Sequence, residues 1–306
     1  MEAFHAFIGG TVQNRIIELS ENPTQLRIRN SLLEIHRDSE LQASIPIKEV
    51  AVLIAAHPRV TFTQSVLGEL SSAGGVFVTC NKSRLPIGMM LPLDGFHQQV
   101  RRFRCQAAAK QALQNRCWQK VVRAKISGQA NTLCFIHGSD AGLKKLVPLV
   151  KSGDRSNVEA RAARRYWSVL FGRQFRRDRD ACDENMWLNY GYSVMRAIVA
   201  RAICGSGLHP GLGLHHHHRG SGFPLADDLM EPFRPVVDRV VYEACNPATT
   251  DQVADTKLRQ SIVGALTSRY LVTDESRTLF DWASRLSASL ANRYECPDSE
   301  FEVPTF

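Results

Sequence analysis

The chain has 306 residues, of which 44% are hydrophobic, and a formal net charge of +8 with a pI of about 9.2. This length can bury one large hydrophobic core or two smaller ones. No run of about 18 apolar residues is present, which excludes a transmembrane helix, and the first residues lack the pattern of a secretory signal. We therefore expect a cytoplasmic protein with no membrane partner, and the positive charge favours a polyanion such as nucleic acid.

The eight cysteines are scattered along the chain, and no two of them form a Cys-x-x-Cys pair. Zinc–thiolate sites are commonly built from such pairs, so a zinc site has little support. In the cytoplasm isolated cysteines stay reduced, and several lie in apolar surroundings, such as Cys204 in AIVARAIC. We interpret them as small core residues.

The first part of the chain shows the patterns of a mixed β structure with one helix, joined by short connections. The expected elements are a hairpin over 25–37 with Asn30 and Ser31 at its turn, strands at 50–54 and 76–79, and a helix at 64–73 that ends at Gly74-Gly75. This part holds few candidate catalytic groups.

Long helical periodicity takes over after Leu91-Pro92-Leu93. Helices are expected at 98–126, 158–171, 190–204, 227–243, 255–268 and 278–293. The fold class is therefore α+β, with a small N-terminal β-rich domain followed by a larger all-helical catalytic domain. The boundaries are expected at 1–95 and 96–295, with a mobile tail at 296–306 because the tail has no periodicity.

Basic residues are concentrated in two stretches of the helical part. The first contains Arg101, Arg102, Arg104, Lys110, Arg116, Lys120, Arg123 and Lys125. The second contains Arg155, Arg161, Arg164, Arg165, Arg173, Arg176, Arg177 and Arg179. Arginine suits bidentate phosphate contacts. Each stretch taken alone is also compatible with a solvated helix face.

Glu159 is the first metal-ligand candidate. It lies in NVEARAARRYW and shares one helix face with Ala162, Ala163 and Tyr166 by i+3, i+4 and i+7 spacing. A carboxylate on a packing face pairs or binds a ligand, because burying it alone is costly. The alternative is a glutamate stabilised by the dipole at the start of the helix.

The second feature is the loop GLHPGLGLHHHHRGSG, which glycine and proline interrupt repeatedly. It carries four consecutive histidines, His215 to His218. Histidine is a common metal ligand and can exchange protons near neutral pH. Four consecutive side chains cannot all point at one site, so most of them are expected to be exposed or packed.

The third feature is LADDLMEPFRPVVDR. On a helix, Asp228, Glu231 and Arg234 share one face, and Leu229 and Phe233 belong to the opposite, core-facing stripe. Two carboxylates beside an arginine suit a divalent cation together with a phosphate. The alternative is an acidic cluster that caps a surface helix.

A glutamate, a histidine and an acidic pair in a basic helical domain favour Mg²⁺ or Mn²⁺, and Mn²⁺ tolerates imidazole better. Such a cation could polarise a phosphodiester. The residues alone therefore indicate a basic helical protein that acts on DNA with a metal. A non-enzymatic DNA-binding scaffold stays open as the alternative.

These segments resemble the integrase subunit of the CRISPR spacer-acquisition complex (the Cas one family), in particular its type II-like branch. The matching segments are NVEARAARRYW, LNYGYSVMRAIVARAICGSGLHPGLGLHH and FPLADDLMEPFRPVVD. They occur in the family's order and spacing, and the likeness covers most of the chain, including the β-domain followed by the helical domain.

The resemblance implies that Glu159, His216 and Glu231 are the catalytic metal ligands, with Asp228 in a supporting role. The family pattern is a glycine, two mostly apolar residues and then the histidine, which Gly213 and His216 match. His215 stands where an apolar residue is preferred and is the alternative ligand if the loop is shifted by one residue. Arg161, Arg164, Arg165 and Arg234 are expected to bind DNA.

The resemblance also implies a reaction and partners. The 3′-hydroxyl ends of a prespacer DNA would attack phosphodiesters at the borders of a CRISPR repeat by transesterification, with Mg²⁺ or Mn²⁺ as cofactor and with associated endonuclease activity. The expected partners are a second copy of the chain, bound through the β-domain, and a dimer of a small ferredoxin-like protein; the effector nuclease is a further candidate. A DNA-repair nuclease that uses water in place of the 3′-hydroxyl is the enzymatic alternative.

Overall fold

The structure is a computed structural model, and it describes residues 7–9, 14–94, 96–178, 181, 183–216, 222–245 and 255–306. The chain divides into two compact units. The first comprises Met1–Gly95 with Gln252–Ser268, and the second Phe96–Asp251 with Arg269–Phe306. In the described part of the chain, no helix has the length and apolar character that crossing a membrane requires.

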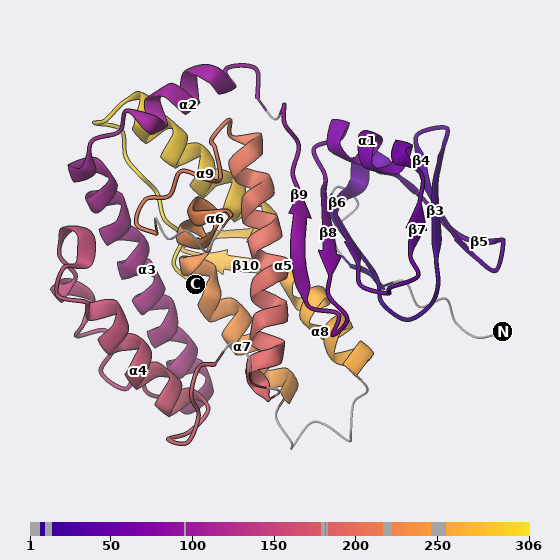
Figure 1. Cartoon of the computed structure of the whole chain (residues 1–306). Helices are drawn as coiled ribbons and strands as arrows, with labels where there is room; N and C mark the ends of the chain where they lie inside the picture. Colours follow the sequence, from indigo (N-terminus) through magenta and orange to yellow (C-terminus); the bar gives the residue numbers. More distant parts are fainter. Residues whose placement is uncertain are drawn as a thin grey trace. The chain divides into compact units, whose positions relative to one another are not determined.

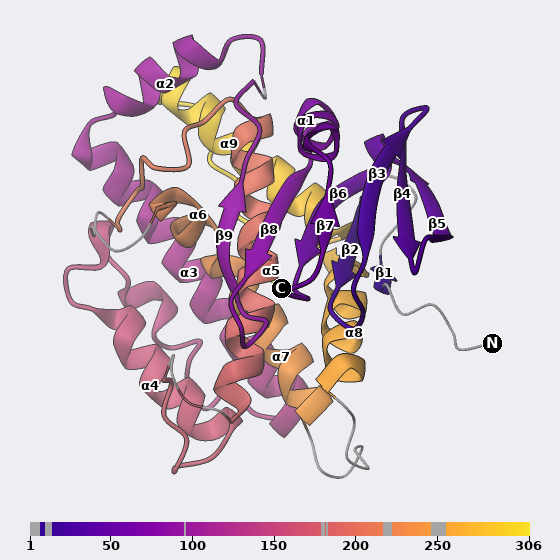
Figure 2. The ribbon, with the colours of Figure 1, turned by 45° about the vertical axis from the view of Figure 1, so that its right-hand side comes forward.

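Two sheets form most of the first unit (Figure 2). One sheet has the strand order β1-β2-β6-β8-β9, made of Phe7–Gly9, Arg15–Leu19, Val50–Ala55, Val76–Cys80 and Pro86–Met90. The other has the order β5-β4-β3-β7, made of Glu40–Pro46, Leu32–Arg37, Gln25–Arg29 and Thr61–Phe62. A one-turn 3₁₀ helix (η1), Ile47–Glu49, leads into β6. The helix α1, Gln64–Ser72, lies between β7 and β8 in sequence.

The predicted hairpin over 25–37 is confirmed. β3 and β4 pair antiparallel, with Arg29 opposite Leu32. The two residues between them, Asn30 and Ser31, have φ values of 51° and 60°. A two-residue turn with both φ values positive matches the right-handed twist of the strands, and asparagine tolerates this conformation well.

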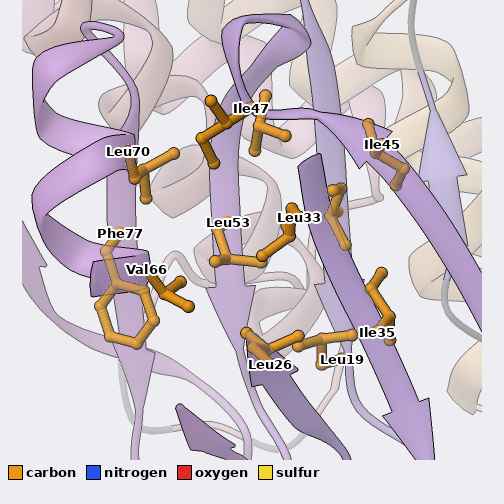
Figure 3. Close-up of a cluster of buried hydrophobic side chains, with 12 residues drawn as sticks. Leu19, Leu26, Leu33, Ile35, Ile45, Ile47, Leu53, Val66, Leu70 and Phe77 are labelled. Atoms are coloured by element: carbon orange, nitrogen blue, oxygen red, sulfur yellow. The ribbon is translucent and has the colours of Figure 1, made fainter. Parts of the chain in front are cut away.

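A hydrophobic cluster joins the two sheets and α1. Figure 3 shows Leu53 of β6 facing Leu33 of β4, with Val66 and Leu70 of α1 on the same cluster. All four of these side chains are fully buried. Burial of this kind contributes about 25 cal/mol per Å² of apolar surface, and it gives the first unit a core of its own.

Helix α8, Asp255–Leu266, belongs to the first unit. It contacts β1, and its buried Arg259 lies 3.7 Å from the buried carboxylate of Glu18 on β2 and donates to the carbonyl oxygen of Arg84. The expected boundary, with 96–295 as one helical domain, placed this helix in the second unit. The helix was correctly predicted, but its packing partners lie far away in sequence, and periodicity carries no information about them.

The second unit is built mainly of helices (Figure 1). They are α2 (Gln99–Ala107), α3 (Gln111–His137), α4 (Val158–Leu170), α5 (Glu184–Gly205), α6 (Pro224–Leu229), α7 (Arg234–Cys245) and α9 (Leu279–Glu295). Short 3₁₀ turns occur at Val147–Leu149 (η2), Ser152–Asp154 (η3) and Glu231–Phe233 (η4). The helix α5 contacts α6, α7 and α9 and is largely buried, as its apolar sequence predicted.

The second unit is not entirely helical, because β10 (Arg269–Val272) and β11 (Glu275–Thr278) form an antiparallel hairpin before α9. Thr278 then caps α9 through a reciprocal pair of contacts with Asp281. The α+β class with an N-terminal β-rich part is confirmed, and this hairpin is an addition to it.

The helix predicted over 227–243 is interrupted. It divides into α6, η4 and α7, with Pro232 and Pro235 in the middle. A proline lacks the N–H that an α-helix needs, and its ring collides with the carbonyl group four residues earlier. The chain therefore tightens into a 3₁₀ turn at Glu231 before the next helix begins.

The prediction of a mobile tail over 296–306 is wrong. Phe301 is 2% exposed, and its carbonyl oxygen accepts a hydrogen bond from Lys120 of α3. Further along, the carbonyl oxygen of Phe306 accepts from Asn131, and the Phe306 ring lies 5.2 Å from that of Phe233. Each of these contacts is with α3 or η4, so the tail is fixed by tertiary packing without forming regular structure.

Candidate metal and phosphodiester site

The start of α4 positions Glu159. Asp154, which is 7% exposed, accepts hydrogen bonds from the backbone N–H groups of Val158 and Glu159 at 3.0 and 2.9 Å. Asn157 adopts a left-handed conformation and accepts from the N–H of Ala160. The first turn of α4 is thus capped by two side chains, and Glu159 projects from a fixed helix end.

The 3₁₀ turn after α6 positions the second carboxylate. Glu231 is 4% exposed, and its Oε1 accepts from Nε of Arg234 at 2.9 Å. Pro232 and Phe233 complete the turn and are buried. Glu231 and Arg234 do share a face, as their spacing predicted, although the helix is broken between them.

Asp228 on α6 holds the histidine loop. Its Oδ2 accepts from the N–H groups of Leu214 and His215 at 2.6 and 2.9 Å, and its Oδ1 lies 2.5 Å from Nδ1 of His216. Both oxygens of Asp228 accept backbone N–H groups of the loop, so we infer that Nδ1 of His216 carries a proton and donates it as well. This arrangement makes Nε2 the ring nitrogen suited to bind a metal, as in carboxylate–histidine–metal sites.

Gly213 is required where the loop passes Asp228. A Cβ atom at this position would lie 2.5 Å from the carbonyl oxygen of His216 and 3.0 Å from Oδ2 of Asp228. Distances below about 3 Å do not occur between such atoms without rearrangement. The glycine three residues before His216 therefore has a steric reason in this fold.

His215 and His216 have different surroundings. The ring of His215 stacks on Trp118 of α3 with centroids 4.5 Å apart and an interplanar angle of 2°, whereas His216 meets the same indole edge-on at 5.6 Å. His216 is the one that pairs with Asp228. The structure thus brings the ring of His216 to Asp228, whereas the ring of His215 lies on Trp118. His217 and His218 lie outside the described residues.

Lys125 of α3 connects the two carboxylates. Its Nζ lies 2.5 Å from Oε1 of Glu159 and 2.5 Å from Oε2 of Glu231. The three residues come from α3, α4 and η4, and α3 contacts both of the other two elements. The sequence placed Lys125 among basic residues for phosphate contacts, and only the fold shows that it shares a site with the two acids.

A buried tyrosine–aspartate network lies next to this cluster. Asp238 of α7 is 1% exposed and accepts from the hydroxyl groups of Tyr166, at 3.0 Å, and Tyr192. The guanidinium of Arg234 lies 4.5 Å from the centre of the Tyr192 ring. The network therefore links α4, α5 and α7 to the arginine that binds Glu231. Sequence reasoning missed it, because an aspartate facing two tyrosines from distant helices has no local pattern.

Gln106 of α2 fixes the beginning of the histidine loop. Its side-chain nitrogen donates to the carbonyl oxygens of His209 and Leu212 at 3.0 and 2.9 Å, and its oxygen accepts from the N–H of His209 at 2.8 Å. The side chain is 2% exposed. Its role also was not visible in the sequence.

The electrostatics keep the site charged. Burial alone would raise the pKa of Glu231, but Arg234 and Lys125 outweigh burial and hold this pKa at about 2. Burial would lower the pKa of Lys125, yet Glu231 and Glu159 raise it above its ordinary value. The hydrogen bond with Asp228 raises the pKa of His216. The Glu231 carboxylate is therefore ionised near neutral pH and can bind a cation.

The predicted donor set fits a hard divalent cation in its chemistry. Among the described residues, no three His, Cys, Asp or Glu side chains lie close enough together to hold a metal ion. The ammonium of Lys125 stands between Glu159 and Glu231. Oε2 of Glu231 is also buried and accepts no hydrogen bond of good geometry from the described residues. A cation already occupies the shared position, which is what two facing carboxylates require.

The arginines predicted to bind DNA fall into two groups. Arg161, Arg164 and Arg165 are exposed on α4, and Arg165 donates to the carbonyl oxygen of Ala141. Arg234 is instead bonded to Glu231 inside the site. Arg161, Arg164 and Arg165 are therefore accessible for contacts with a nucleic-acid backbone.

Comparison with known proteins assigns the chain to a family. The sequence model of the family described as "CRISPR associated protein Cas1" matches residues 17–267. The chain belongs to the Cas1 family. The CRISPR-associated endonuclease Cas1 of Neisseria meningitidis serogroup C (strain 8013) is 37% identical over 226 residues, which is 73% of this chain and 73% of that relative.

Solved structures share the Cas1 fold with this chain. A Cas6-RT-Cas1–Cas2 complex matches with a TM-score of 0.77 at 17% identity, covering 96% of this chain but only 36% of that one. A casposase bound to integration product matches with a TM-score of 0.74 at 19% identity, covering 94% of this chain and 95% of that one. At such low identity these matches establish the fold alone.

Proposed function

We propose that this Cas1-family protein is a metal-dependent DNA integrase of CRISPR adaptation, with associated endonuclease activity. It would join the 3′-hydroxyl ends of prespacer DNA to the CRISPR repeat by transesterification. The observation that carries the proposal is that the carboxylates of Glu159 and Glu231 share one cation position, where the Lys125 ammonium lies, while Asp228 orients His216 near enough to be influenced by the charge of both glutamates. Membership of the family supports the same conclusion.

Glu159, His216 and Glu231 would hold Mg²⁺ or Mn²⁺. A cation there supplies Lewis-acid stabilisation of the negative charge that develops on the attacked phosphate. The chain's own groups do the rest of the positioning. Asp228 keeps the proton of His216 on Nδ1, and Arg234 holds one oxygen of Glu231 so that the other faces the shared cation position.

The reaction would exchange one phosphodiester for another. The 3′-oxygen of the prespacer forms a bond to phosphorus and loses its proton, while the bond from phosphorus to the 3′-oxygen of the repeat breaks and that oxygen gains a proton. No covalent enzyme intermediate is needed. The exposed arginines of α4, Arg161, Arg164 and Arg165, would hold the DNA backbone near the site.

The proposal includes partners. Prespacer and repeat DNA are the substrates, a second copy of the chain would bind through the β-rich unit, and a dimer of a small ferredoxin-like protein would bridge two such dimers; the effector nuclease is a further candidate. The complex that contains Cas1 and Cas2, and the casposase bound to integration product, support a partner protein and DNA joining in proteins of this fold.

The test is strand transfer of a labelled duplex with 3′-hydroxyl ends into a plasmid that carries a CRISPR repeat. The small partner protein is present, and reactions contain either Mn²⁺ or EDTA. Wild-type protein is compared with Glu231→Ala and Glu159→Ala. We expect joined product that requires Mn²⁺ and both glutamates, with DNA binding largely retained in both variants.

Other outcomes identify the alternatives. Cleavage without joining would indicate a nuclease that uses water. The Neisseria relative is named an endonuclease, which is the reason for keeping this alternative. DNA binding with neither reaction, in the presence of the host factors of the repeat locus, would indicate a scaffold.

A further inference from the structure

Lys125 has surroundings that a phosphate-binding lysine does not need. Its side chain is 11% exposed and comes from the middle of the 27-residue helix α3. It reaches one carboxylate on α4 and another on η4, each at 2.5 Å. A buried ammonium is stable only with such partners, and the two carboxylates in turn need a cation between them.

The Glu231 oxygen that Lys125 contacts is the one that Arg234 leaves open. Oε1 of Glu231 is already bonded to Arg234, and the ammonium lies against Oε2. Asp228 is engaged with the histidine loop. Lys125 therefore occupies the position between Glu159 and Glu231 that the proposed function gives to a divalent cation.

An ammonium and a divalent ion cannot share that position. Carboxylate oxygens approach Mg²⁺ at about 2.0–2.1 Å, and a second positive charge within bonding distance of the same oxygens would be repelled. Lysine can leave, because its charge is a compact point on a flexible stem of four carbons. Arginine would be harder to displace, since its planar fork can bind both carboxylates at once.

We propose that Lys125 is a resident counter-cation that the divalent metal displaces. It keeps Glu159 and Glu231 paired and the three elements packed before the metal arrives. Metal binding then releases the ammonium from both carboxylates. This inference rests on the metal site of the proposed function and adds a competition between a side chain of the protein and its cofactor.

The test measures Mn²⁺ affinity directly, by the electron paramagnetic resonance signal of free Mn²⁺, and thermal unfolding in EDTA and in Mn²⁺, all without DNA. In Lys125→Met the competitor is gone, so Mn²⁺ should bind on the order of tenfold more tightly. The same variant should unfold several degrees lower than wild type in EDTA, because two carboxylates lose their cation, and Mn²⁺ should remove most of that difference. Lys120→Met is the matched control, since Lys120 is on the same helix, its side chain is 48% exposed, and it bonds a backbone carbonyl outside the site.

Lys125→Arg covers the case in which Lys125→Met does not fold. It retains a cation and should bind Mn²⁺ several-fold more weakly than wild type. Equal Mn²⁺ affinity in wild type and in whichever of these variants folds would overturn the competition. Weaker binding by Lys125→Met would also overturn it and show that the lysine helps to build the site.

A failure of the proposed metal site gives a different result. In that case wild type would show no Mn²⁺ binding that Glu231→Ala abolishes. If wild type binds Mn²⁺ through Glu231 while Lys125→Met and the Lys120→Met control bind it equally well, the metal site stands and the displacement of Lys125 alone is rejected.

Discussion

Asp228 of α6 holds His216 of the histidine loop, with Oδ1 and Nδ1 2.5 Å apart. The same carboxylate accepts backbone N–H groups from the loop that carries the histidine. One acidic side chain therefore fixes both the path of the loop and the protonation of the ring.

Replacing Asp228 with asparagine should weaken Mn²⁺ binding by about 10–100-fold, the range typical for loss of a carboxylate behind a metal-binding histidine. The amide would still accept backbone hydrogen bonds but would no longer hold the imidazole by charge. Mn²⁺ titration measures the effect. Asp227→Asn is the control, because Asp227 is the neighbouring acid and pairs with Arg196 at 2.8 Å. Equal losses in the two variants would contradict the assigned role.

Alanine substitutions distinguish the two described histidines. His216→Ala should abolish strand joining with little change in the folded state. His215→Ala should keep joining and lower the free energy of unfolding by about 1 kcal/mol, because it removes a ring stacked on Trp118. His218→Ala should also be tolerated. Joining assays and urea unfolding of the variants decide this, and the reverse pattern for His215 and His216 would mean that the loop is shifted by one residue.

The double change Arg164→Ala and Arg165→Ala should weaken DNA binding and make it less sensitive to salt. Each phosphate contact that is lost reduces the slope of log affinity against log salt by about 0.9. Binding of a duplex is measured between low and moderate salt. Arg27→Ala with Arg29→Ala, on the exposed face of β3, removes the same charge elsewhere and should leave the slope unchanged. An unaltered slope in the α4 variant would show that Arg164 and Arg165 do not bind the phosphates of the DNA.

The buried carboxyl group of Asp238 should make the free energy of unfolding fall as the pH rises from 4 to 7. Burial raises its pKa from 3.8 to about 7, although Tyr192 and Tyr166 oppose the shift. Below pH 4 the carboxyl group is protonated in both the folded and unfolded states. Between pH 4 and pH 7 the unfolded chain has released this proton, whereas the folded chain has kept it. The free energy of unfolding therefore falls by about 1.4 kcal/mol per pH unit over this range. Above pH 7 the effect is constant.

Asp238→Asn removes this titration and keeps an oxygen that accepts from the tyrosines. The stability of the variant relative to wild type should therefore increase between pH 4 and pH 7 and then level off. Urea unfolding of both proteins across this range measures the difference. Curves that run parallel would show that Asp238 keeps an ordinary pKa in the folded protein.

Local sequence predicted the helical segments, although it joined α2 to α3 and α6 to α7, and among the strands it predicted β3, β4, β6 and β8. The turn residues Asn30 and Ser31 marked the first hairpin, and the apolar run of α5 marked a buried helix. The break in the helix after Asp228 was less clear, because the acidic and apolar spacing continues through two prolines. Steric restriction at Pro232 and Pro235 decided the backbone there.

The residue types alone marked Glu159, the histidine loop and the acids Asp228 and Glu231 as candidates, and the resemblance to the family singled out His216 within the loop. The family pattern also includes the glycine three residues before the histidine, and the structure shows that a side chain at Gly213 would collide with the loop. These are short-range requirements of backbone and side-chain chemistry, which a sequence carries in itself.

The tertiary structure alone decided which groups meet across long separations. It placed Lys125 between Glu159 and Glu231, Asp238 beside Tyr166 and Tyr192, and α8 with the β-rich unit. It also packed the tail on α3. Such contacts follow from the burial of several distant faces at once, and no local pattern records them.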